Sequence, residues 1–396
     1  MKSRPILNVA IVLATFAPTL AVPSCASPDT SDESVSTQTQ AISKFHRYDA
    51  TSSVFASFEM LPAGVAGDEK VVLVGSPLEG RVIALDRVTR KEIGQLPAPP
   101  EGFVLPYILR SLGEHRIAVL DAGGLPSPLP FVPANPRIYE YEYRIDPSRG
   151  FVAALKRSIS FEGNLIGFAE DIAPIGRGRY VLSDASLGAL WVVDSDGSVR
   201  PGIAPKSNAP EDSLFPLAFC PKMPEITVGG VPFLFTESSL PGVAALASRG
   251  NQLYFYSPCA RGLYSVPIAS FFDARAPYER ISDVKLVSPA PPSVAVEQLL
   301  GLTFDRYESK DSFLYAADSL QLRIIRIDVE NGARQVVAAD PTLFNFPSSA
   351  AFLPPVHGVS PLVVVSNQQH RMVLTNDAIS EDIVQPPFVA TEVIVR

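Results

Sequence analysis

The chain has 396 residues, of which 46% are hydrophobic and 19% are charged, so it can bury a large hydrophobic core. Its formal net charge is −8 and it contains no run of Lys or Arg, which argues against a nucleic-acid partner, because phosphate backbones are bound by clustered cations. The 38 Pro and 25 Gly predict many turns and few helices.

Residues 1–26 are typical of an export signal. A short basic start precedes residues 5–22, an apolar stretch that is too short and too interrupted for a membrane span. Residues 22–25 resemble a lipoprotein cleavage box in which Cys25 would be lipidated. The alternative is ordinary cleavage, for example after Ala26, which gives a freely secreted protein. We therefore expect a secreted, periplasmic or outer-membrane-anchored protein that contacts a membrane only through a lipid on Cys25.

Residues 27–43 follow as a tether before the folded domain, which we expect over residues 44–396. The tether is rich in Ser, Thr, Asp and Gln and contains no Lys or Arg, so it buries too little apolar surface to order itself.

The three cysteines fit an exported protein. If Cys25 is lipidated or removed, Cys220 and Cys259 remain, and an even number of cysteines in an oxidising compartment predicts a disulfide between them. The alternative is a pair of small buried thiols.

A repeated hairpin pattern indicates the fold. Each copy is a short apolar run that ends in Ser or Asp, a polar connector, and a second apolar run that ends ten residues later. Five copies lie at 71–86, 180–194, 253–267, 314–328 and 362–376, and a sixth, over 117–146, contains a Pro-rich insertion. Such repeats are stacked supersecondary units. They predict an all-β fold, a six-bladed β-propeller of four-stranded antiparallel blades.

Each hairpin is preceded by an apolar run that can form the inner strand of its blade. These runs are 57–61, 103–109, 168–173, 243–246, 300–304 and 349–353. The alternating segment 388–396 is suited to closing the ring against the first blade, which removes an exposed sheet edge. Seven blades remain an alternative if 201–242 hides a degenerate blade, whereas a two-sheet sandwich does not predict hairpins of fixed length.

The Ser or Asp that closes the first run of each hairpin has two interpretations. A short polar side chain at a strand end can accept hydrogen bonds from nearby backbone N–H groups and fix the turn. Because the residue recurs in every blade, this structural role explains most copies. A minority could instead line the central channel and bind a ligand.

Two of the repeats carry a family resemblance. LGLTFD at 300–305 followed by LYAADS at 314–319 resembles the regucalcin/gluconolactonase family, and EDIA at 170–173 is similar to the same family's N-D-I-A strand. The resemblance implies a six-bladed propeller and, for some members, divalent-metal-dependent lactone hydrolysis. It also implies a metal at the mouth of the central channel, held by one Glu, two Asn and one Asp.

The resemblance maps only in part onto this chain. Asp318 matches the metal-binding Asp, and Glu170 stands where the first Asn is found. Leu300 stands where the second Asn is found and cannot coordinate a metal, while Glu59 is a loose counterpart of the Glu. We expect Asp318, Glu170 and Glu59 to hold Ca²⁺ or another divalent metal. The alternative is that they are ordinary polar residues of a wet funnel.

The functional expectation is correspondingly general. We expect an exported, monomeric propeller with an acidic-lined central funnel that binds a small-molecule ligand or a protein. The alternative is a divalent-metal-dependent lactone or ester hydrolase, in which the metal polarises the carbonyl and a channel carboxylate activates water. No G-x-S-x-G motif is present to suggest a serine hydrolase of the α/β type, and no catalytic residue is assigned.

Overall fold

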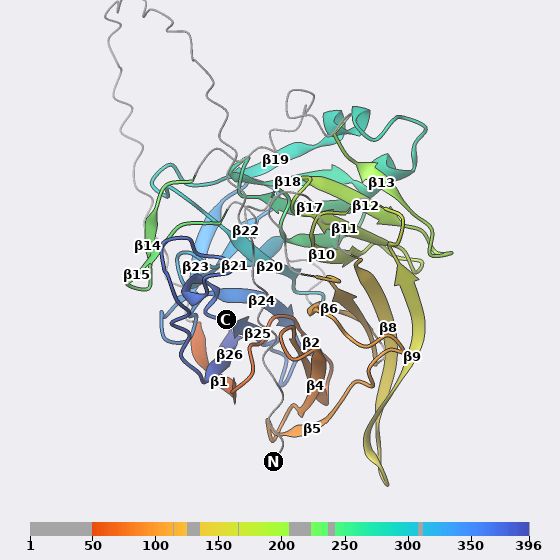
Figure 1. Ribbon diagram of the computed structural model, residues 1–396, viewed down its shortest axis with the longest axis vertical. Helices are drawn as coiled ribbons and strands as arrows, with labels where there is room; N and C mark the ends of the chain where they lie inside the picture. The colour runs from red at the N-terminus through yellow and green to blue at the C-terminus, as the bar shows by residue number, and fades with distance from the viewer. Residues whose placement is uncertain are drawn as a thin grey trace, which may run out of the picture. The chain divides into compact units, whose positions relative to one another are not determined.

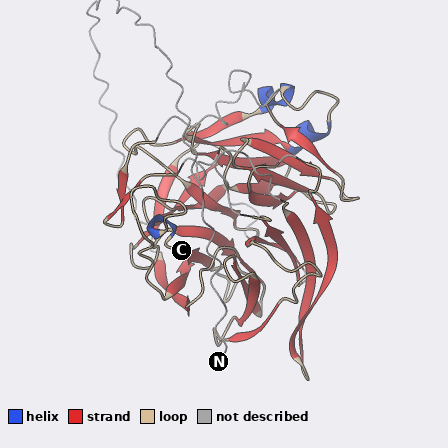
Figure 2. Ribbon diagram, viewed as in Figure 1, coloured by secondary structure: helices blue, strands red, loops and turns tan. Residues whose placement is uncertain are grey.

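The computed structural model describes residues 50–113, 115–124, 135–164, 166–205, 223–236, 242–307 and 312–395. All of them belong to one of two compact units, residues 45–396. In these described residues, the regular structure is strand except for three short 3₁₀-helices: η3 (Ile268–Phe272), η4 (Glu279–Asp283) and η5 (Gln369–Arg371) (Figure 2). No helix in these segments is long and apolar enough to cross a membrane. The predicted signal, the tether and Cys25 lie outside the described residues.

Six four-stranded antiparallel sheets form the blades (Figure 1). Blades 1 to 3 are, from the inner strand outwards, β2 (Val65–Gly67), β3 (Val71–Ser76), β4 (Arg81–Asp86), β5 (Glu92–Gln95); β6 (Pro106–Gly113), β7 (Arg116–Asp121), β8 (Arg137–Asp146), β9 (Gly150–Ser160); and β10 (Ala169–Pro174), β11 (Tyr180–Asp184), β12 (Ala189–Val193), β13 (Val199–Ile203). Blades 4 to 6 are β16 (Leu246–Arg249), β17 (Gln252–Ser257), β18 (Gly262–Pro267), β19 (Lys285–Pro289); β20 (Leu299–Phe304), β21 (Phe313–Asp318), β22 (Arg323–Asp328), β23 (Arg334–Ala339); and β24 (Pro347–Phe352), β25 (Leu362–Ser366), β26 (Phe388–Ile394), β1 (Thr51–Phe58).

The inner strands of the blades form a closed ring. Each of β2, β6, β10, β16, β20 and β24 contacts the inner strands of the two neighbouring blades. The six-bladed β-propeller predicted from the repeats is therefore confirmed. Four of the five regular hairpins, and the interrupted sixth copy, also pair as predicted, in β3–β4, β7–β8, β11–β12, β17–β18 and β21–β22.

The regular hairpins share one local geometry. Four residues connect the two strands, and the last of them has a positive φ. Gly80 and Gly188 adopt this conformation without a steric penalty, while Arg261 and Leu322 adopt it with a side chain. The fixed connector explains why the spacing of the repeat is constant.

The predicted first inner strand, 57–61, is wrong. Residues 51–58 form β1, which pairs with β26 as the outermost strand of blade 6, and the short buried β2 is the inner strand of blade 1. The N-terminal strand thus closes the ring. The burial of β1 agrees with an outer position, since half of its residues are exposed.

The predicted hairpin over 362–376 is also wrong in its second half. β25 pairs with β26, and the other edge of β26 pairs with β1. Residues 373–375 form a turn after η5, and Asn376 forms an isolated bridge with Phe235. The short run Val373-Leu374 is 39% and 36% exposed, whereas β26 alternates in burial along its length and has partners on both edges. β26 is therefore the more stable partner for β25, because it pairs along both edges and buries one face.

The described part of the long insertion in 201–242 forms no seventh blade. After β13 it contains a two-stranded hairpin, β14 (Ile226–Val228) and β15 (Val231–Phe233). Val228 and Phe233 pack in one apolar cluster with Leu300 of β20 and with Phe346, which immediately precedes β24. The hairpin therefore covers part of the ring where these inner strands begin.

Candidate functional site

The inner strands give the channel two distinct ends. We call the end at which they begin, near Glu170 and Leu300, the start end. The end at which they finish, near Pro174 and Phe352, is the finish end. Asp318 and Glu170, which match positions of the family's metal site, lie at the start end.

The repeated Ser or Asp is buried in every blade, with at most 2% of the residue exposed. Asp121 accepts hydrogen bonds from the backbone N–H groups of Val104 and Leu105, both at 2.7 Å. Asp184 does the same for Gly167 and Phe168, at 3.0 and 3.2 Å. These carboxylates fix the chain as it enters the inner strand, which is the structural role expected for most copies.

Asp318 differs from these two carboxylates. Its Oδ2 accepts a hydrogen bond of 2.8 Å from Nε of Arg323, while its buried Oδ1 has no hydrogen-bond partner in the described chain. Burial raises the pKa of Asp318 to about 6, although the charge of Arg323 opposes the rise. Asp318 lies at the start end, opposite Leu299 of β20.

Glu170 lies at the start end on a β-bulge of β10 and is 8% exposed. The hydroxyl of Tyr107 donates a hydrogen bond of 3.5 Å to its Oε1. Burial, with a further contribution from the charge of Asp171, raises the pKa of Glu170 to about 8. Glu170 is therefore mostly protonated at pH 7, which makes it a poor ligand for a cation.

The three predicted metal ligands do not form one site. Glu59 is exposed just beyond β1. Within the described ranges, no group of three or more His, Cys, Asp or Glu could hold a metal ion, so Glu59, Glu170 and Asp318 are not brought together as one. Leu300 packs in the apolar cluster under β14–β15. The residues present at the start end therefore do not fit the family's divalent metal.

An ion pair links three blades between the two ends. Arg110 of β6 reaches Asp171 of β10 through Nη2, at 2.6 Å from Oδ1 and 2.5 Å from Oδ2. The same guanidinium donates to the carbonyl oxygens of Ile172, at 2.9 Å, and Leu246, at 3.2 Å. Asp171 also accepts the backbone N–H of Leu246, at 2.8 Å. Both side chains of the pair are nearly buried, so the pair fixes blades 2, 3 and 4 relative to one another.

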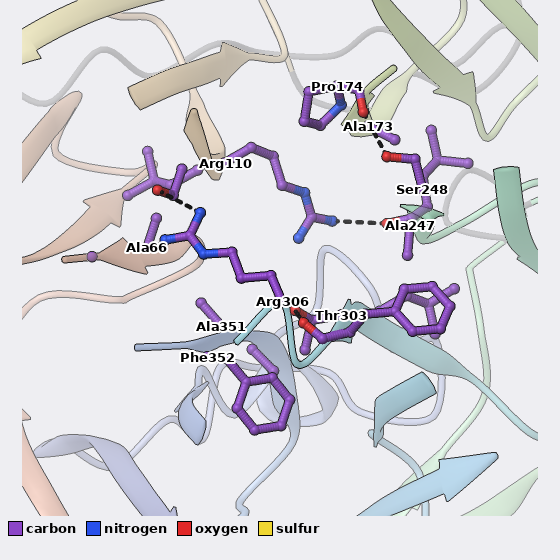
Figure 3. Close-up of a pocket in the computed structure, with 17 residues that line it drawn as sticks. Ala66, Arg110, Ala173, Pro174, Ala247, Ser248, Thr303, Arg306, Ala351 and Phe352 are labelled. Atoms are coloured by element: carbon purple, nitrogen blue, oxygen red, sulfur yellow. Dashed lines mark hydrogen bonds between the residues drawn. The ribbon is translucent and has the colours of Figure 1, made fainter. Parts of the chain in front are cut away.

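The finish end holds a pocket of about 160 Å³, shown in Figure 3. All six inner strands contribute to its lining. Much of the wall is alanine, and these short side chains leave the space open: Ala66, Ala173, Ala247, Ala350 and Ala351. Figure 3 shows the side chains of Arg110 and Arg306 extending across the middle of the pocket.

Arg306 is the second charged residue of the pocket and is exposed. Its Nη1 donates to Oγ of Ser111 at 3.0 Å, and its Nη2 donates to the hydroxyl of Tyr307 at 2.6 Å. In the described part of the chain, Arg306 forms no ion pair. The hairpin repeat does not indicate Arg306, because this residue follows an inner strand and belongs to no hairpin. The sequence signal that could have indicated the pocket is the recurrence of alanine in or near the inner strands of several blades.

Cys259 forms a disulfide and is 9% exposed. Cys220 lies outside the described residues, so the pairing of Cys220 with Cys259 stays a prediction.

The chain matches no protein-family model and no curated protein sequence. Among solved structures it is similar to a protein of unknown function from Bacteroides thetaiotaomicron, with 12% identity, 89% of this chain and 73% of that chain covered, and a TM-score of 0.51. Regucalcin from Agrobacterium tumefaciens, described as calcium-binding, is 15% identical, with 89% and 96% covered and a TM-score of 0.48. A gluconolactonase from Xanthomonas campestris is 10% identical, with 88% and 90% covered and a TM-score of 0.48. The neighbours thus include propellers of the predicted type, and the likeness concerns the fold alone.

Proposed function

We propose that the chain is an exported propeller protein that binds a small molecule at the finish end of its central channel. The observation that carries this proposal is the pocket to which all six blades contribute, with small apolar walls and two arginines. Its volume of about 160 Å³ is below the roughly 300–1,000 Å³ of pockets for drug-sized ligands, so its ligand has few non-hydrogen atoms.

The alternative is a divalent-metal-dependent lactone or ester hydrolase. The free Oδ1 of Asp318 favours it, because a buried carboxylate oxygen without a partner is costly unless a ligand completes it. The apolar packing of Leu300 and the protonation of Glu170 oppose it. Binding without metal chemistry is therefore the better supported function.

Filling the pocket should abolish binding. Ala351 is partly exposed in the pocket wall, so Ala351→Leu adds volume there with little overpacking of the core. A panel of small sugars, hydroxy acids and amino acids at millimolar concentration, followed by ligand-observed NMR, should reveal binding to the wild type and none to the variant. The matched control is Ala153→Leu on β9, the outer strand of blade 2, which should bind as the wild type does. Binding that survives Ala351→Leu, or a wild type that binds no member of the panel, would contradict the proposal.

Divalent metals should leave the stability unchanged. A metal at 100 times its Kd would add about 2.7 kcal/mol to the free energy of unfolding, so a metal site would be plain in thermal melts. We expect the same melting temperature with and without millimolar Ca²⁺, Mg²⁺, Mn²⁺ or Zn²⁺. Asp318→Asn keeps the size of the side chain and should change the free energy of unfolding by about 1 kcal/mol, through its hydrogen bond with Arg323. A rise in wild-type melting temperature that Asp318→Asn removes would restore the hydrolase alternative.

A further inference from the structure

We infer that the ligand of the pocket at the finish end is a small carboxylate and that Arg306 binds its carboxylate group. This inference rests on the proposed function and adds the chemical class of the ligand. It follows from the charges around the pocket, from the hydrogen bonds that each arginine already makes, and from the size and polarity of the walls.

The charges of the pocket lining are unbalanced. Among the residues that the structure describes, two arginines line it, and no Asp or Glu does. Arg110 is neutralised by Asp171 and donates hydrogen bonds to two backbone carbonyl groups, so its guanidinium is already paired within the protein. Arg306 has only the neutral hydroxyls of Ser111 and Tyr307 as described partners. Within the described lining, one positive charge is therefore left without a carboxylate against it.

The carboxylate nearest to Arg306 in the sequence, that of Asp305, accepts a hydrogen bond within its own turn. Asp305 is 6% exposed, and its Oδ1 accepts the backbone N–H of Tyr307 at 2.9 Å. This bond shapes the turn that follows β20 and holds Arg306 at the edge of the pocket.

Arg306 is oriented before any ligand arrives. Its guanidinium lies 4.9 Å from the ring centroid of Tyr307, and two of its five N–H donors are used by Ser111 and Tyr307. The remaining donors of the planar group match the two oxygens of a carboxylate. A side chain that is already fixed loses less conformational entropy on binding, which favours affinity.

The walls of the pocket limit which chemical group the carboxylate of the ligand can carry. Alanines and Phe352 offer apolar contact, while Ser248 and Thr303 bring hydroxyl groups to the lining. Together with the volume of about 160 Å³, this composition suits a short chain that carries a hydroxyl group. L-Lactate has this size and chemistry, and lactamide is its neutral counterpart of the same shape.

Titration calorimetry with these two compounds tests the inference on the full-length protein. We expect sodium L-lactate to bind the wild type against a sodium chloride background of equal ionic strength, and lactamide to bind at least about tenfold more weakly. Arg306→Gln should weaken lactate binding by about tenfold or more, because hydrogen bonds to charged groups are stronger than neutral ones. Arg306→Lys keeps the charge and loses the planar group, so its affinity for lactate should lie between those of the wild type and Arg306→Gln. The control is Arg144→Gln on β8, an exposed arginine outside this pocket, which should bind lactate as the wild type does.

The outcomes separate this inference from the proposed function. If lactamide binds as tightly as lactate and Ala351→Leu abolishes both, the pocket binds ligands but the carboxylate class is overturned. Equal lactate binding by the wild type and by folded Arg306→Gln, with melting temperatures that agree, overturns the role of Arg306. Binding of inorganic phosphate in place of lactate overturns the carboxylate in favour of another anion. If lactate at 20 times the protein concentration and above gives no heat, the inference fails whatever other compounds the pocket binds.

Discussion

Replacing Asp171 with Ala should destabilise the protein by about 3–5 kcal/mol, because Arg110 would remain in the interior without its counter-charge. The side chains of the pair are only 12% and 2% exposed, so water can replace only a small part of the interaction with the lost carboxylate. The variant also loses the acceptors for the backbone N–H groups of Ile172 and Leu246. Urea denaturation followed by far-UV circular dichroism measures the change.

A double variant separates the cost of the unpaired charge from the rest of the loss. Arg110→Met combined with Asp171→Leu removes both charges and should recover the part of the stability that the unpaired Arg110 costs, while the N–H groups of Ile172 and Leu246 still lack their acceptors. The exposed pair of Lys156 with Glu142 is the control, and Glu142→Ala should cost no more than about 1 kcal/mol. A loss below about 1 kcal/mol for Asp171→Ala would show that water or another residue compensates Arg110.

The free energy of unfolding of Glu170→Gln should increase relative to that of the wild type as the pH rises. Burial raises the pKa of Glu170 to about 8, so from about pH 5 to pH 8 the folded protein holds a proton that the unfolded chain has lost. Raising the pH in this window therefore favours unfolding, and the wild type loses roughly 1.4 kcal/mol per pH unit from this one group. Above pH 8, Glu170 is ionised in both states and the loss levels off. Gln binds no proton, so the variant lacks this decline.

The measurement is the difference in free energy of unfolding between wild type and variant from pH 5 to pH 9. Burial raises the pKa values of Asp184 and Asp318 to about 6, so their ionisation also lowers the free energy of unfolding as the pH rises. This contribution is the same in both proteins and cancels in the difference. Glu142→Gln, at an exposed glutamate of β8, should follow the wild type at every pH. A constant difference between wild type and Glu170→Gln would show that Glu170 is ionised throughout the window.

The repeat pattern predicted the fold because a fixed connector fixes the spacing of each hairpin. Four residues join the strands, and the spacing survives even where Leu322 or Arg261 replaces glycine at the left-handed position. The last blade could not be predicted from the same rule, since β25 pairs with β26 after a long connection. Local sequence gave a plausible hairpin over 362–376, and the tertiary partnership of β26 with both β25 and β1 overrode it.

The candidate site was less accessible to sequence reasoning. The motif around Asp318 located a buried carboxylate at the start end, but it could not show that Leu300 packs under a hairpin from a distant insertion. The pocket at the finish end has no contiguous motif. It arises because alanines from separate blades meet near the axis, and such a coincidence exists only after the ring has closed. The pairing of charges cannot be predicted from the sequence either, since nothing in it indicates that Asp171 pairs with Arg110 while the described partners of Arg306 are the hydroxyls of Ser111 and Tyr307.

The pairing of β1 with β26 also bears on when the protein can fold. Thr51 lies opposite Ile394, so the contact that completes blade 6 joins two described strands that are far apart in the sequence. Because β1 is synthesised long before β26, it lacks its partner until β26 has been made. Bringing such distant segments together costs loop entropy and slows folding. Completion of the ring therefore waits until β26 has been synthesised, and blade 6 stays open until then.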